Sequence, residues 1–178
     1  ERAVGADPGS AIAYAHLSTA YLKKHTTNPD AQWMKLARET AQRAVDLNGD
    51  LGASRLAIGF VQLQAGERAN TDASFRKAAE LDPMNPMPHV GLAMNFAADR
   101  KNADAEAAFR KAVELGPKEW RAPAEYGQFE FRRAHYQEAE ALWESALQIT
   151  PDNALVMRNL GAVYFVLDRP DEAASILQ

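Results

Sequence analysis

The chain has 178 residues, of which 47% are hydrophobic and 25% charged, with a formal net charge of −4 and no cysteine. The lack of cysteine excludes disulfides and thiolate metal sites, and the acidic balance argues against a nucleic-acid-binding protein, which needs a basic face for phosphates. The longest apolar run, residues 160–167, is too short to span a bilayer, so we expect no membrane insertion by this segment.

The sequence repeats itself every 34 residues. Pro83, Pro117 and Pro151 end the related segments AAELDP, AVELGP and ALQITP, and Gly49 ends AVDLNG one period earlier. A period of this length is typical of a two-helix unit that stacks on its neighbours to form a solenoid. The repeat therefore predicts an all-α fold, and we expect no strand.

Hydrophobic spacing and helix stop signals place two helices in each repeat. The first helices are predicted at 11–25, 52–65, 86–99, 120–133 and 154–167. The second helices are predicted at 29–47, 69–81, 103–115, 137–149 and 171–178. Because every linker is short, we expect one curved rod.

We expect residues 1–178 to form a single array that is a fragment of a longer array or of a larger protein. Ala3 and Pro8 fall in register with the small residue and the proline of the repeats, so residues 1–8 are interpreted as the tail of a preceding repeat. The predicted repeats are 11–51 with an insertion, 52–85, 86–119, 120–153 and a truncated 154–178.

The first repeat is seven residues longer than the others, since Gly49 follows Pro8 by 41 residues. Asn28 and Pro29 are typical of an N-cap and a first helical residue, so we expect the extra length in helix 29–47. Two roles remain open for Trp33 on this helix. Packing against helix 11–25 is favoured over a protruding recognition feature.

Aligned on the proline as position 32, the repeats share small residues at positions 8, 20 and 27 and large residues at position 24. Position 8 holds Ser18, Gly59, Ala93, Gly127 and Gly161, and position 24 holds Phe75, Phe109, Trp143 and Leu177, with Ala41 as the exception. This pattern resembles the tetratricopeptide (TPR) repeat over essentially the whole chain. The resemblance implies a right-handed superhelical solenoid of antiparallel helix pairs.

In the tetratricopeptide family the first helices line a concave groove, chiefly through positions 2, 5, 9, 12 and 13. Carried onto this chain, those positions give the groove an apolar middle and a positively charged end in the later repeats. The alternative is that these residues are half-buried and pack only on neighbouring helices. The predicted peptide-binding residues are Leu56, Phe60, Leu63, Met87, Val90, Met94, Gln128, Phe131, Arg132 and Arg158.

The family's chaperone-binding members hold a terminal carboxylate with a polar clamp. Here the clamp positions carry Ala15, Thr19 and Ala57, so a chaperone tail is a poor candidate ligand. No phosphate-binding loop, metalloprotease motif or serine-hydrolase motif occurs. The four histidines are scattered, with no metal-ligand spacing. We therefore expect no catalysis, no cofactor and no metal.

The predicted function is a protein–protein interaction scaffold that binds a peptide or helix in its groove. The stretches around NPDAQWMKLA and LGPKEWRAPAEYGQFEFRRAHYQEAEALW resemble the TPR regions of bacterial serine/threonine protein kinases. That resemblance implies a larger bacterial signalling protein, while the compartment stays undetermined. The alternatives are a structural module that self-associates through uncapped ends and an assembly or secretion co-factor.

Overall fold

The computed structural model describes residues 2–176, and every regular element in that range is an α-helix. The all-α prediction is therefore confirmed. The helices are α1 (Arg2–Ala6), α2 (Ala11–Thr27), α3 (Ala31–Leu47), α4 (Gly52–Ala65), α5 (Arg68–Leu81), α6 (Met87–Ala98), α7 (Asn102–Leu115), α8 (Arg121–Arg132), α9 (Tyr136–Ile149), α10 (Ala154–Val166) and α11 (Pro170–Ile176).

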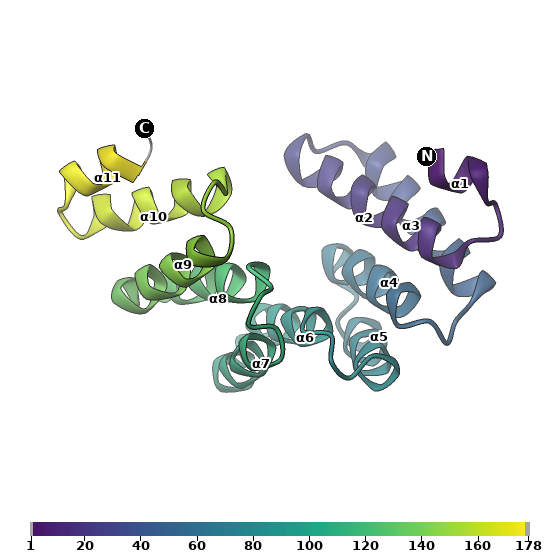
Figure 1. The fold of residues 1–178 in the computed structure, drawn as a ribbon. Helices are drawn as coiled ribbons and strands as arrows, with labels where there is room; N and C mark the ends of the chain where they lie inside the picture. The colour runs from purple at the N-terminus through teal and green to yellow at the C-terminus, as the bar shows by residue number, and fades with distance from the viewer. Residues whose placement is uncertain (1, 177–178) are drawn as a thin grey trace.

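From α2 onward the helices pack in consecutive pairs, and the pairs follow an arc with an N-terminal and a C-terminal arm (Figure 1). The first helices contact one another from pair to pair: α2 with α4, α4 with α6, α6 with α8 and α8 with α10. In the described part of the chain, no second helix contacts the next second helix. Close first helices and separated second helices bend the stack, which places α4, α6 and α8 on the concave side.

A phenylalanine fixes the contact between the second and third pairs. Phe75 on α5 is fully buried. A Cβ built on Gly59 would lie 2.7 Å from its ring, and a Cβ built on Gly91 of the next pair would lie 2.3 Å from it. The ring thus occupies the space left by two missing side chains, which explains why these helices approach so closely.

A tryptophan plays the same part in the fourth pair. A Cβ added to Gly127 would lie 2.9 Å from the indole nitrogen of Trp143, which is almost fully buried. The indole N–H donates a hydrogen bond to the carbonyl oxygen of Ala124, at 3.0 Å. Helices α8 and α9 are therefore joined by the packing of a large residue against a small one, and also by a buried hydrogen bond.

Four of the five turns within the helix pairs share a backbone conformation. Gly66, Arg100, Ala134 and Asp168 occupy the same repeat position, and their φ angles are 77°, 59°, 62° and 58°. This left-handed conformation costs a non-glycine residue about 1–2 kcal/mol. Only Gly66 adopts it without that cost, so the other three turns are held by the helices that flank them.

The first pair differs from the prediction in how it uses its extra residues. Helices α2 and α3 are both 17 residues long, so the insertion lengthens both helices rather than the second alone. The predicted cap is also wrong. Asn28 ends α2, and Asp30 caps α3 by accepting a hydrogen bond from the backbone N–H of Gln32, at 2.8 Å. An added turn on one helix exposes apolar surface unless its partner lengthens equally.

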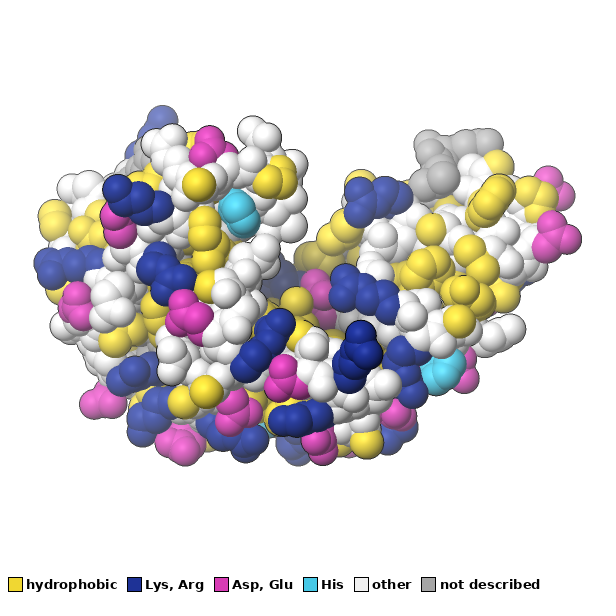
Figure 2. Space-filling view, turned by 180° about the vertical axis from the view of Figure 1, so that it is seen from behind, with side chains coloured by type: hydrophobic (Ala, Val, Ile, Leu, Met, Phe, Trp, Pro, Cys, Tyr) yellow, Lys and Arg dark blue, Asp and Glu magenta, His cyan; other side chains and the backbone are white. Residues whose placement is uncertain are grey.

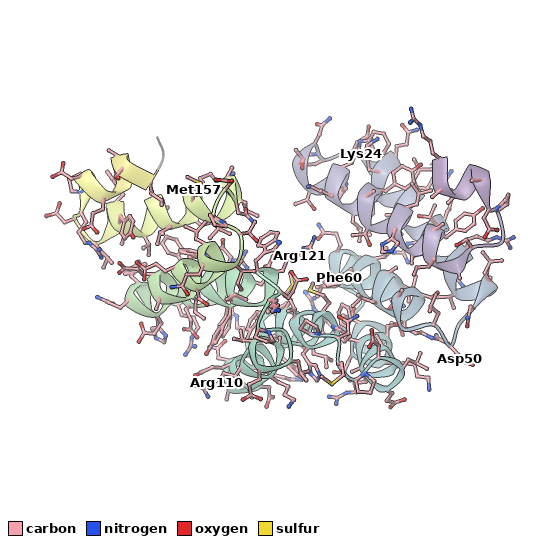
Figure 3. All side chains as sticks on the ribbon, viewed as in Figure 1. Lys24, Asp50, Phe60, Arg110, Arg121 and Met157 are labelled. Atoms are coloured by element: carbon pink, nitrogen blue, oxygen red, sulfur yellow. The ribbon has the colours of Figure 1, made fainter. Side chains whose placement is uncertain are left out.

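Trp33 packs against α2, as favoured from the sequence. Its ring stacks on Tyr21 with centroids 5.9 Å apart, and the ammonium of Lys24 lies 4.4 Å from the Trp33 ring centroid. Lys24 lies on the N-terminal arm, while Phe60 and Arg121 lie on the inner side of the arc and Arg110 on its outer side (Figure 3). Trp33 therefore stabilises the long hairpin and does not protrude from it.

Candidate functional site

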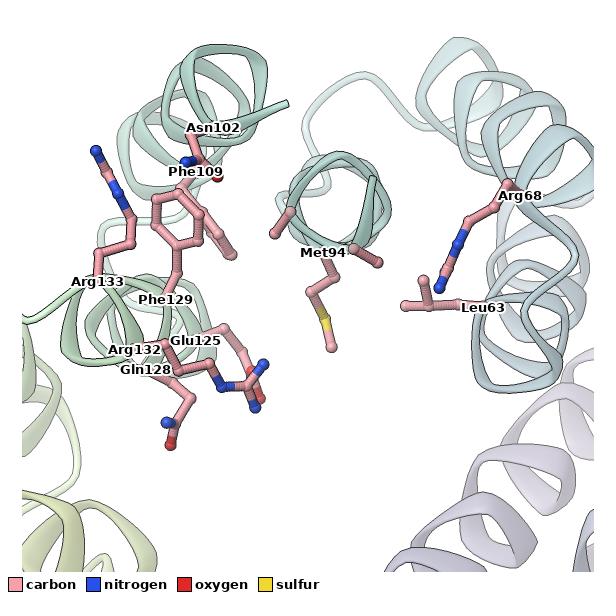
Figure 4. A pocket seen from close by; sticks show the side chains of 12 residues that line it. Leu63, Arg68, Met94, Asn102, Phe109, Glu125, Gln128, Phe129, Arg132 and Arg133 are labelled. Carbon is pink, nitrogen blue, oxygen red and sulfur yellow. The ribbon is translucent and has the colours of Figure 1, made fainter. Parts of the chain in front are cut away.

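The concave side contains a hollow of about 340 Å³ between α6 and α8, seen from close by in Figure 4. Its lining comes from the ends of the second and third pairs and from the exposed face of α8. The lining residues are Leu63, Arg68, Met94, Ala97, Ala98, Asn102, Phe109, Glu125, Gln128, Phe129, Arg132 and Arg133.

The two walls of the hollow differ in chemistry. Leu63 on α4 and Met94 on α6 form an apolar wall, and the Met94 side chain points into the open space (Figure 4). Across from them, α8 presents Glu125, Gln128 and Arg132. These three residues share one helix face because they are three and four positions apart. A ligand here would meet apolar surface on one side and hydrogen-bonding groups on the other.

Glu125 is the unusual residue of the polar wall. Burial raises the pKa of its carboxyl above the ordinary value, and the positive charges of Arg132 and Arg121 oppose that shift only in part. Within residues 2–176 it makes no hydrogen bond and no ion pair within 4 Å. In the described residues, the only fully buried side-chain atom without a hydrogen-bond partner is Oδ1 of Asn95. The unpartnered oxygens of Glu125 are therefore not fully buried and keep some contact with solvent.

The arginines around the hollow differ in how far they are already paired. Arg68 pairs with Asp99 at 3.5 Å, and Arg133 contacts the buried Glu130 at 3.2 Å. Arg132 is exposed and has no ion pair within 4 Å in the described residues. Arg132 is therefore the arginine of this hollow without a close ion-pair partner, although its charge acts on the Glu125 carboxyl.

The structure brings four of the predicted residues together in the hollow: Leu63, Met94, Gln128 and Arg132. The remaining six do not line it. Leu56, Phe60, Met87 and Phe131 are half-buried, Arg158 is exposed on α10, and Val90 is buried.

Val90 is a correction, because its side chain is only 1% exposed and belongs to the core of the third pair. A groove side chain was expected there, but the close approach of α6 to its neighbours covers this position. Phe60 and Phe131 follow the half-buried alternative. Phe60 meets Phe75 edge-on at 5.0 Å between centroids, and Phe131 lies 5.6 Å from Trp143.

Sequence reasoning missed Glu125, Arg68 and Asn102 as lining residues. A signal for Glu125 was available, because it lies four residues after Arg121 and seven before Arg132, on the face already predicted to point into the groove. Arg68 and Asn102 start second helices, which the family pattern assigns to the convex side. They reach the hollow because the arc brings the turns of neighbouring pairs close to it.

Two other kinds of site are absent from the described residues. Residues 2–176 contain no group of three or more His, Asp or Glu side chains arranged to hold a metal ion. In the same range, no helix combines the length and the apolar character needed to cross a membrane.

Comparisons with known proteins agree with this fold. The tetratricopeptide repeat family model matches residues 131–178. The chain is 31% identical over 134 residues to the type IV pilus assembly protein PilF of Pseudomonas aeruginosa. The fold is a tetratricopeptide repeat solenoid. The solved structure of P. aeruginosa PilF superimposes with a TM-score of 0.70 at 17% identity, covering 97% of this chain and 75% of that one.

A second solved structure is YrrB, described as a TPR protein with an unusual peptide-binding site. It matches with a TM-score of 0.55 at 17% identity, covering 98% of this chain and 87% of that one. The alignment with the PilF sequence covers 71% of this chain and 53% of PilF. The chain therefore spans about half the length of the curated relative that it matches.

Proposed function

We propose that this TPR array is a protein–protein interaction scaffold that binds a peptide or helix of a partner along its concave side. The observation that carries the proposal is the hollow between α6 and α8, with an apolar wall at Leu63 and Met94 and the unpaired Arg132 opposite. Solenoids offer extended concave surfaces for this purpose. Flexible methionine side chains adapt to more than one sequence.

The proposed ligand mode follows the chemistry of the two walls. An apolar side of the ligand would pack on Leu63 and Met94, and an acidic group would reach Arg132, with Arg158 on the next first helix available to a longer ligand. Exposed arginines contribute orientation and association rate more than affinity. Raising the salt concentration should therefore slow association while much of the affinity remains.

The test is a selection of random 12-residue peptides displayed on phage, made against the wild-type protein and against groove variants. Leu63→Ala/Met94→Ala should lose most of the selected peptides, and Arg132→Ala should lose those with acidic residues. The matched controls are Met84→Ala and Arg110→Ala, since Met84 is 73% exposed in a turn and Arg110 lies on the outer side of the arc. Equal binding by all variants would place the ligand elsewhere.

We further propose that the protein takes part in assembling a larger structure. The support is the likeness to PilF, a pilus assembly protein. The kinase-associated signalling role remains an expectation from sequence resemblance, and the sequence upstream of Glu1 tests it: a kinase catalytic domain there would favour signalling over assembly. The division into repeats beginning at residues 11, 52, 86, 120 and 154 is likewise a proposal.

Self-association is a second candidate function, because α10 exposes large apolar side chains. Phe165 is 76% exposed, and Leu155 and Val166 are nearly half exposed. Hydrophobic side chains also gather on the C-terminal arm in the space-filling view (Figure 2). An exposed apolar patch usually marks a contact surface. Light scattering coupled to size-exclusion chromatography should show dimers that Phe165→Ser abolishes; a strict monomer at all concentrations would remove this candidate.

A further inference from the structure

The α8 wall carries a carboxyl group that the protein itself does not pair. Glu125 makes no hydrogen bond and no ion pair within 4 Å in the described part of the chain, and its side chain is half-buried, with its oxygens still in contact with solvent. Partial burial disfavours the charged form of an unpaired carboxylate, and carboxylates in such surroundings concentrate at functional sites. The nearest charged groups on α8, Arg121 and Arg132, compensate the burial only in part.

Groups on the other elements around the hollow do not supply the missing partner. On α5, Arg68 is paired with Asp99, and next to α8, Arg133 is engaged by Glu130 and Glu106. Asn102 begins α7, and α4 and α6 contribute Leu63, Met94, Ala97 and Ala98. The described chain therefore leaves the Glu125 carboxyl available to pair with a basic group of a ligand.

We propose that Glu125 selects ligands with a basic side chain that enters this hollow and pairs with its carboxylate. The inference rests on the proposed groove function and adds the chemistry of the ligand. A lysine or arginine fits both walls, because its aliphatic stem can pack on Leu63 and Met94 while its charged head reaches Glu125. Figure 4 shows these side chains facing the same open space.

The spacing on α8 adds a second requirement. Glu125 and Arg132 are seven residues apart, which is about 10 Å along the helix axis at ~1.5 Å per residue. A ligand that satisfies both carries a basic side chain near Glu125 and an acidic side chain near Arg132, whose backbone positions are about 10 Å apart. In an extended ligand lying along α8 that distance is about three residues, and in a helical ligand it is about seven.

The first experiment compares phage-displayed 12-residue peptides selected on wild type, Glu125→Gln and Arg132→Gln. The expected wild-type selection is a Lys or Arg with an Asp or Glu about three or seven residues away. Glu125→Gln should lose the basic preference and keep the acidic one, and Arg132→Gln should do the reverse. Glu114→Gln is the matched control, because Glu114 is 69% exposed on the outer helix α7.

The second experiment measures affinity by fluorescence anisotropy with one selected peptide and with its lysine replaced by norleucine. Removing the charge of one partner leaves the other partner unpaired in the hollow, so the replacement should weaken binding to wild type by at least about tenfold, which is about 1.4 kcal/mol. It should change binding to Glu125→Gln by less than about threefold. Glu125→Gln should also remain fully folded, since it removes a charge that no protein group pairs.

The outcomes separate this inference from the function on which it rests. Peptides that need Leu63 and Met94 but show the same residue preferences on wild type and Glu125→Gln would overturn the role of Glu125 and leave the groove function standing. Peptides that bind Leu63→Ala/Met94→Ala as well as wild type would overturn both. A basic preference that only Glu125→Gln abolishes supports both.

Discussion

The contact between Phe75 and Gly91 offers the sharpest test of the packing, through the substitution Gly91→Ala. The new Cβ would lie 2.3 Å from one ring carbon of Phe75 and 2.5 Å from two others. Carbon atoms pack at about 3.5–4.0 Å, so the ring would have to move by more than about 1 Å. The Phe75 ring is fully buried and also borders Gly59, where an added Cβ would lie 2.7 Å from it. The ring therefore has no free space to move into.

The size of the effect combines two opposing contributions. Overpacking a filled core costs about 1–3 kcal/mol, and because this overlap is severe we place its cost at or somewhat above about 3 kcal/mol. Replacing glycine by alanine inside a helix returns about 1 kcal/mol. We therefore expect Gly91→Ala to lower the free energy of unfolding by about 2 kcal/mol, which corresponds to a Tm about 4–8 °C lower for a chain of this size.

The assay is urea unfolding followed by far-ultraviolet circular dichroism. Gly5→Ala is the control for helix propensity alone, since no atom lies within 4 Å of a Cβ added there. In a double-mutant cycle with Phe75→Leu, the smaller side chain leaves room for the added methyl group. The loss of unfolding free energy caused by Gly91→Ala should then be at least about 1 kcal/mol smaller than in wild type. The reasoning would be refuted if Gly91→Ala were equally costly in both backgrounds, or if it stabilised the protein as helix propensity alone predicts.

Three further predictions follow from single side chains. Ala134→Gly should raise the free energy of unfolding by about 0.5–1 kcal/mol, because the φ angle of 62° costs alanine about 1–2 kcal/mol and glycine loses part of that gain in chain entropy. Gly66→Ala should lower the free energy of unfolding, because it lies in the equivalent turn and no atom lies within 4 Å of the added Cβ. Denaturant unfolding measures both changes. Glu125→Gln should raise Tm at pH 7 and change it little at pH 4. The raised pKa of Glu125 means that the folded state binds the proton more tightly than the unfolded state, so the stability that this proton contributes is present at low pH and is lost as pH rises through the folded pKa. An equal Tm shift at both pH values would count against the unpaired carboxylate. Glu114→Gln is the control. Gly127→Leu should lower Tm strongly, because the Cβ of the leucine alone would lie 2.9 Å from Trp143 and the rest of the side chain needs more space. An unchanged Tm in a thermal scan would contradict the alignment of the repeats.

The helix pairs were predictable because their determinants are local. The proline period, the small residues and the stop signals each act within one repeat, and all recur. The match between Gly127 and Trp143 also lies within a repeat, and it joins a small residue at position 8 to a large residue at position 24. The packing of Phe75 on Gly91 was not predicted, because it joins two repeats and depends on how far the second helix of one leans over the first helix of the next.

The groove was predictable only in outline. Leu63, Met94, Gln128 and Arg132, which the family positions predicted as groove residues, line the hollow, and their role in binding a peptide stays a prediction. The family positions failed for Val90, because the burial of a position depends on how closely its helix approaches the neighbouring helices, which no single repeat encodes. Glu125 lay on the predicted face but outside the family's usual positions. Its burial also depends on residues from other helices, so its unusual environment became visible only in three dimensions.

The most direct test of the central claim, that partners bind along the concave side, is a map of backbone amide chemical shifts in the isotope-labelled protein. The titrant is a peptide selected on the wild type. We predict that the largest shift changes fall on α4, α6 and α8, above all around Leu63, Met94 and Gln128, and that Met94→Ala removes them. Shift changes concentrated on the outer helices α5, α7 and α9, with α6 and α8 unaffected, would contradict the claim.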